Sequence, residues 1–125
     1  MKTYLLVVRD RPEDFAGLDE AAMTAIVARY RAWGEDLAGR GRLVGGQKLV
    51  DGGGRVVRGN NGQLSVHDGA FTESREIIGG YYVLRAEDDE EALRLVSDHP
   101  HLETRGSLEL REVDELDGAL PDAGS

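Results

Sequence analysis

Short apolar runs and one helical stripe organise the first third of the chain. Residues 4–8 are apolar or aromatic in succession, which predicts a strand covered on both faces. After a polar stretch, Asp19 can cap a helix whose apolar positions recur at helical spacing, and residues 39–41 supply glycines to end it. Residues 43–50 are then expected to form a second strand. The helical stripe, which we expect to lie in the core, consists of Met23, Ile26, Tyr30, Trp33 and Leu37.

Glycine-rich turns divide the middle of the chain. Residues 51–54 predict one turn, and residues 59–62 predict a second. The short segments beside the second turn, 55–57 and 63–66, are expected to form a hairpin. Residues 67–76 then predict a polar loop.

The last part of the domain repeats the alternation of strand and helix. Residues 80–85 predict a strand, and Asp88 with Glu91 three residues later has capping-box spacing for a helix that Pro100 should end. Residues 107–113 alternate apolar and charged side chains, which predicts a strand with one polar face.

The elements together predict an α+β domain of order βαββαβ with a hairpin insertion. Right-handed crossovers would place both helices on one face of a four-stranded antiparallel sheet. The strands at 4–8 and 81–84 are apolar on both faces, so the second face also needs a cover. A second copy could bury on the order of 2,000 Å² or more there. We therefore expect a homodimer with a pocket between or beside the two sheets.

Length and composition restrict the class of protein. The 125 residues suit one domain, expected at 1–113, followed by an acidic, flexible tail at 114–125. The net charge of −9 disfavours nucleic acid as a partner. Since the chain contains no cysteine, thiolate catalysis and disulfides are excluded. No run of apolar residues is long enough for a membrane span and no targeting signal is visible, so we expect a cytoplasmic protein.

Two familiar kinds of site are disfavoured. The glycines lack the spacing and context of a phosphate loop or a dinucleotide fingerprint, and we expect no cofactor. His99, His101 and Glu103 could ligate a metal if their segment were extended. Such residues around a helix end are more often solvated polar groups, so we predict no metal site.

The densest ionisable chemistry lies in the predicted polar loop. His67, Asp68, Glu73, Arg75 and Glu76 fall within ten residues, directly before an apolar strand. Arg75 could hold one carboxylate while another, partly desolvated, serves as an acid or base. His67 could then relay a proton.

A structural interpretation of the same loop stays open, and residue types alone favour it. Asp68 would cap backbone amides in a turn, and Phe71 would anchor the loop in the core. Glu73, Arg75 and Glu76 would then form a ladder of surface ion pairs.

The loop resembles the DGPF branch of the YCII-related family. The matching residues are Asp68-Gly-Ala-Phe71, Glu73, Arg75-Glu76 and Gly79-Gly-Tyr-Tyr82, and weaker matches extend the resemblance over residues 1–113. Ala70 stands where the branch has proline, and Arg75 stands where it has lysine.

The resemblance implies a ferredoxin-like α+β protomer that forms a dimeric α/β barrel. The family is largely uncharacterised, and the His-Asp pair of its other branch cannot be carried over, because residues 29–33 contain no histidine. Members of the DGPF branch occur beside or fused to extracytoplasmic-function sigma factors, which implies a sigma factor as a possible partner.

Two functional hypotheses follow. In the first, the protein is a cofactor-free enzyme acting on a small organic molecule. Its acid and base are Asp68 and Glu76, and its proton relay is His67. The substrate contacts expected for it are Arg75, Glu73, Phe71 and Tyr82. In the second hypothesis, the protein is a non-catalytic module that senses a ligand or binds a sigma factor.

Overall fold

A computed structural model describes residues 1–50, 52, 54–68 and 76–115. Its strands and helices follow the order predicted from the sequence. In chain order they are β1 (Lys2–Asp10), η1 (Pro12–Asp14), α1 (Glu20–Gly39), β2 (Leu43–Lys48), β3 (Arg55–Asn60), β4 (Gln63–Asp68), β5 (Ile77–Ala86), α2 (Asp89–Val96), η3 (Pro100–Glu103) and β6 (Ser107–Glu112).

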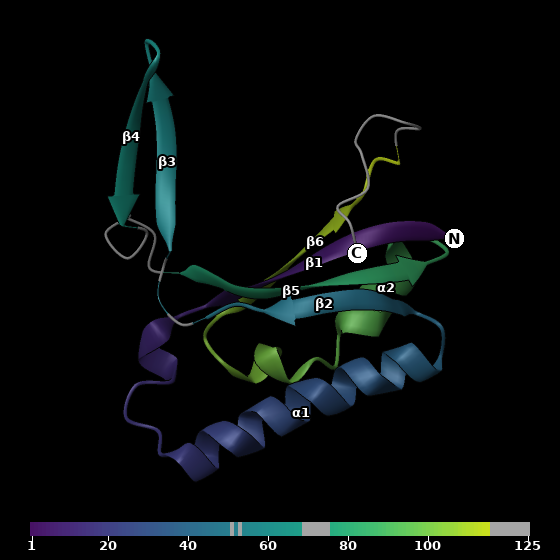
Figure 1. Cartoon of the computed structure of the whole chain (residues 1–125). Coiled ribbons are helices and arrows are strands. Elements are labelled where there is room, and N and C mark those ends of the chain that lie inside the picture. The colour runs from purple at the N-terminus through teal and green to yellow at the C-terminus, as the bar shows by residue number, and fades with distance from the viewer. Residues whose placement is uncertain (51, 53, 69–75, 116–125) are drawn as a thin grey trace.

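Four of the strands form one antiparallel sheet in the order β2-β5-β1-β6. Figure 1 shows α1 and α2 on the same side of this sheet, as the right-handed crossovers predict. Strands β3 and β4 form a separate hairpin between β2 and β5. The α+β class is thereby confirmed, and the arrangement is consistent with a ferredoxin-like fold.

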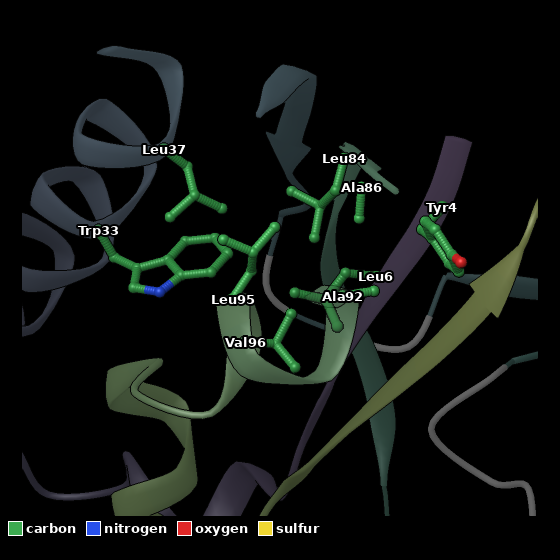
Figure 2. Close-up of a cluster of buried hydrophobic side chains, with 9 residues drawn as sticks. All are labelled: Tyr4, Leu6, Trp33, Leu37, Leu84, Ala86, Ala92, Leu95 and Val96. Atoms are coloured by element: carbon green, nitrogen blue, oxygen red, sulfur yellow. The ribbon is translucent and has the colours of Figure 1, made fainter. Parts of the chain in front are cut away.

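The core lies between the sheet and the helices (Figure 2). The stripe on α1 reaches this core only in its second half, where Trp33 and Leu37 are buried. Met23, Ile26 and Tyr30 are half-buried, so the expectation that the whole stripe is core is wrong for its first half. The reason is that α1 packs partly against β2 and partly against the short helix η3.

Both helix starts are capped as predicted. The Asp19 carboxylate accepts a hydrogen bond from the Ala22 amide at 2.8 Å, and Asp88 accepts one from Glu91 at 2.8 Å. The Glu91 side chain in turn accepts a hydrogen bond from the Glu87 amide at 2.9 Å. Of the described helices, none has both the length and the apolarity that a membrane crossing needs.

The predicted end of α2 needs correction. Helix α2 ends at Val96 and is capped by Ser97, and Pro100 begins the short helix η3 instead of ending α2. Proline suits this first-turn position because its missing amide hydrogen would have no partner there.

The hairpin is also longer than predicted. Asn61 (φ 50°) and Gly62 (φ 83°) form its turn, so pairing runs from Asn60↔Gln63 back to Arg55↔Asp68. His67 and Asp68 therefore end strand β4 instead of beginning the predicted loop.

Candidate functional site

The face of the sheet opposite the helices is apolar at its centre. Tyr4 and Leu6 point into the core, so the residues that alternate with them on β1 point away from it. The pairs Leu5↔Val83 and Val7↔Tyr81 lie side by side on this helix-free face. These four half-buried residues are called the apolar patch below.

Charged and polar side chains border the apolar patch along β6 and at the Arg9 end of β1. The Arg9 Nε and Nη2 atoms donate to Glu109 Oε1 at 3.0 and 2.5 Å, and Arg111 Nη1 lies 3.8 Å from Glu109 Oε2. The Ser107 hydroxyl, opposite Arg9 in the sheet, donates to Glu76 Oε2 at 3.1 Å. We call Arg9, Glu76, Ser107, Glu109 and Arg111 the polar strip. Its hydrogen bond from Arg9 lowers the pKa of Glu109, which keeps that carboxylate ionised.

A β-bulge lies at the border between the patch and the strip. Val8 pairs with Gly80 and Arg9 pairs with Ile78, so Gly79 is the extra residue on β5. A Cβ atom on Gly79 would lie 2.5 Å from the Asp10 Cγ atom, so a larger residue here would require the Asp10 side chain to move. Arg9 follows Leu5 and Val7 on the helix-free face by the alternation of β1, and Asp10 turns toward the helices.

The residues that the sequence singled out lie in different places. Glu76 belongs to the polar strip. His67 and Asp68 are exposed on β4, where the His67 Nε2 atom lies 2.7 Å from the Ser65 hydroxyl oxygen. His67 and Glu76 thus lie on different parts of the described fold, His67 on the hairpin and Glu76 beside Ser107 of β6. The other three predicted residues, Phe71, Glu73 and Arg75, lie outside the described residues.

Tyr82 faces the helices. Its ring packs edge-on against Trp33 and His99 at centroid distances of 5.0 and 5.4 Å. Burial raises the pKa of its phenol. Because neighbouring residues of a strand point to opposite faces, Tyr81 is the aromatic residue of the helix-free face.

Two histidines that we expected to be solvated are buried. His99 and His101 are 1% and 0% exposed, so that expectation is wrong. The carbonyl oxygen of Arg9 can only accept, so His101 Nε2 donates to it at 2.7 Å, and Nδ1 accepts from the Tyr30 hydroxyl at 2.6 Å. This arrangement ties η3 to both β1 and α1.

His99 completes the same buried cluster. Its Nδ1 atom accepts the His101 amide at 2.9 Å, so Nε2 carries the proton toward the Tyr82 hydroxyl at 3.1 Å. Burial, together with the nearby His101, lowers the pKa of His99 to about 4. The neutral ring is thus a structural link between η3 and β5.

The third member of the possible metal set lies elsewhere. Glu103 pairs with Arg29 at 2.6 Å on the surface. Within the part of the chain that the structure describes, no three His, Cys, Asp or Glu residues are arranged to hold a metal ion. The ring nitrogens of His99 and His101 are instead hydrogen-bonded within the fold, in a cluster of aromatic side chains.

A sequence signal for this cluster does exist. Tyr30 and Trp33 lie on the inner stripe of α1, and a buried phenol or indole usually needs a polar partner. Trp33 Nε1 donates to Asp98 at 3.0 Å, directly before His99. The buried histidines could have been inferred from that need.

A surface hollow lies at the other end of β1 and β6. Its volume is about 380 Å³, and residues 1–3 and 112–115 line it. Glu112, Asp114 and Glu115 line this hollow together with Lys2, whose Nζ atom lies 3.6 Å from Glu112 Oε1.

Comparison with known proteins identifies the family. The family model for the YCII-related domain matches residues 2–117. The chain therefore belongs to the YCII-related family, as the resemblance in the sequence indicated. No curated protein matches it.

Proposed function

We propose that this YCII-related protein is a homodimer that encloses a small organic molecule and transforms it by acid/base chemistry without a cofactor. The observation that carries the proposal is the helix-free face, where an apolar patch adjoins a charged strip. Binding pockets commonly combine an apolar lining with a few polar groups that orient the ligand.

A second copy is the cover that suits this face. Leu5, Val7, Tyr81 and Val83 form a contiguous apolar surface that the helices of the same chain leave open (Figure 1). Two identical faces can pack about a two-fold axis, which gives a closed dimer. Packed in this way, two ferredoxin-like protomers form the dimeric α/β barrel that the family resemblance implies.

Glu76 is the acid or base that the geometry favours. Its carboxylate is half-buried and is held by Ser107 at the end of the apolar patch. A molecule lying on the patch would have its polar end near Glu76, and Arg9 would attract an anionic group on it. In this proposal Asp68 and His67 join from the hairpin, and Arg75, Glu73 and Phe71 from the connecting segment.

The test begins with crystals soaked in a mixed library of small carboxylic acids, amines and phenols. We expect density on the apolar patch within reach of Glu76. For the compound found, Glu76→Gln should lower turnover at least 100-fold with little change in binding, because general acid/base catalysis contributes about 10²- to 10⁴-fold.

Glu90→Gln is the matched control. Glu90 is an exposed carboxylate in the first turn of α2, on the other side of the sheet, and its variant should keep full turnover. Unchanged turnover in Glu76→Gln, or density only away from the helix-free face, would refute the enzymatic proposal.

The three carboxylates around the hollow favour a second candidate function, a module that binds a sigma factor. Glu112, Asp114 and Glu115 lie together there and could contact a basic surface. Affinity capture with an extracytoplasmic-function sigma factor tests this function. Binding that is lost in Glu112→Lys with Asp114→Lys would support it, and no capture by the unaltered chain would reject it.

A further inference from the structure

One face of the β3–β4 hairpin is apolar and exposed. In its register Val57 lies opposite Val66, and Leu64 is the next residue on the same face. These three side chains, here called the arm face, are 57%, 52% and 77% exposed, respectively. The opposite face carries Arg58, Ser65 and His67 together with the half-buried Val56.

The rest of the described chain offers this hairpin little support. Strands β3 and β4 pack chiefly against each other. In Figure 1 the hairpin stands away from the four-stranded sheet, on the side opposite α1. A lone two-stranded hairpin is marginally stable in water, and its exposed apolar face adds to the cost. The arm face therefore needs a surface from outside the described chain.

We propose that the hairpin is a dimerisation arm whose apolar face packs against the second copy of this chain. This inference rests on the proposed homodimer. The hairpin leaves the sheet after β2 and returns at β5, and it projects on the helix-free side, where the second copy would lie. Leu49 and Val50, in the segment between β2 and the hairpin, also expose apolar side chains.

The area that a stable dimer must bury also favours a second copy of this chain as the partner of the arm face. Four strands about 4.8 Å apart and about six residues long give a face of roughly 400 Å². Two such faces bury about 800 Å², whereas stable interfaces start near roughly 1,200 Å². Each arm face adds about 200 Å², and the surface that it covers adds about the same. With both arms docked the interface reaches about 1,600 Å², the standard size.

The first experiment measures the dimer dissociation constant by sedimentation. In the triple variant Val57→Thr, Leu64→Thr and Val66→Thr, threonine keeps the strand preference but removes the apolar surface. We expect the dissociation constant to rise at least 100-fold. The control variant, Arg58→Thr with Ser65→Thr, changes the opposite face of the same strands and should shift it less than threefold.

The outcomes separate this inference from the proposed dimer. An unaltered chain that is monomeric at every concentration overturns both. A dimer that the triple variant leaves equally tight overturns the arm alone. A dimer weakened by the triple variant and unaffected by the control supports the arm.

A second measurement does not depend on how the triple variant folds. The chain has no cysteine, so Leu64→Cys introduces a single thiol on the arm face. Its reaction with an aromatic disulfide reagent should slow at least tenfold above the dimer dissociation constant. Arg58→Cys, at an exposed position on the opposite face, should react equally fast at all concentrations. A Leu64→Cys thiol that reacts equally fast in the dimer contradicts the arm.

Discussion

At the scale of single residues, the half-buried Tyr30 and the buried Trp33 of α1 have hydrogen-bonding partners in the segment that follows α2. Tyr30 pairs with His101, and Trp33 pairs with Asp98. Each hydrogen bond satisfies a polar group that burial would otherwise leave without water, which costs about 1–3 kcal/mol per group. The short segment from Asp98 to His101 thereby fixes how α1 lies against the sheet.

The lowered pKa of His99 predicts a pH-dependent stability. Its pKa is about 4 in the folded protein and about 6.5 when unfolded, so the unfolded chain binds the extra proton between these values. The contribution of His99 is therefore complete above pH 6.5 and is lost as the pH falls toward 4. The loss amounts to about 3 kcal/mol of the free energy of unfolding. Urea unfolding at pH 7.0, 5.5 and 4.5 measures it.

The variant His99→Gln isolates this contribution, because glutamine stays neutral throughout the range. Its free energy of unfolding should change much less between pH 6.5 and 4.5 than that of the unaltered chain. His67→Gln, on the exposed hairpin, is the control and should keep the full dependence. Asp14 and Glu109 have lowered pKa values, so their stabilising charges are lost only below about pH 4.5. Equal pH profiles for His99→Gln and the unaltered chain would contradict the prediction.

At the scale of elements, local signals predicted both helices and the order of the strands. The caps at Asp19 and Asp88 are visible because each carboxylate acts within its own turn. The alternation of apolar and charged residues in 107–113 also predicted β6, because it too is a local pattern in the sequence. The end of α2 was misplaced because proline marks where a helix cannot continue, while the packing around His99 ends α2 earlier.

The cap of α2 carries the element-scale prediction. Asp88→Ala removes the acceptor for the Glu91 amide and should lower the free energy of unfolding by about 1 kcal/mol. Asp88→Ser should recover most of this loss, since serine also caps helices well. Glu90→Ala, an exposed change two residues after the cap, should cost less than about 0.5 kcal/mol. Denaturant titration with unchanged m-values gives these differences, and equal losses for Asp88→Ala and Glu90→Ala would mean that the cap contributes nothing.

At the scale of the whole molecule, the candidate site consists of residues that only the sheet brings together. Arg9 and Glu109 are 100 positions apart in sequence, yet they share a hydrogen bond on the helix-free face. The cluster of ionisable residues in 67–76 drew attention to Glu76, but composition could not show that Glu76 reaches Ser107. The β-bulge at Gly79 also depends on strand register, which a single sequence specifies only weakly. The fold could therefore be predicted more fully than the site.

A homodimer makes the melting temperature depend on protein concentration. Dilution favours separate unfolded chains, so a 100-fold increase in concentration should raise the melting temperature by about 5 °C. Val7→Lys places a charge at the centre of the apolar patch and should abolish this dependence. Leu93→Lys makes the same kind of change on α2, where Leu93 is 58% exposed, and should preserve it. Calorimetry at 2 and 200 μM, a roughly 100-fold range, measures the melting temperature of the unaltered chain and of both variants. If the unaltered chain melts at one temperature across that range, the helix-free face is not closed by a second copy, and the pocket proposed between the two sheets does not exist.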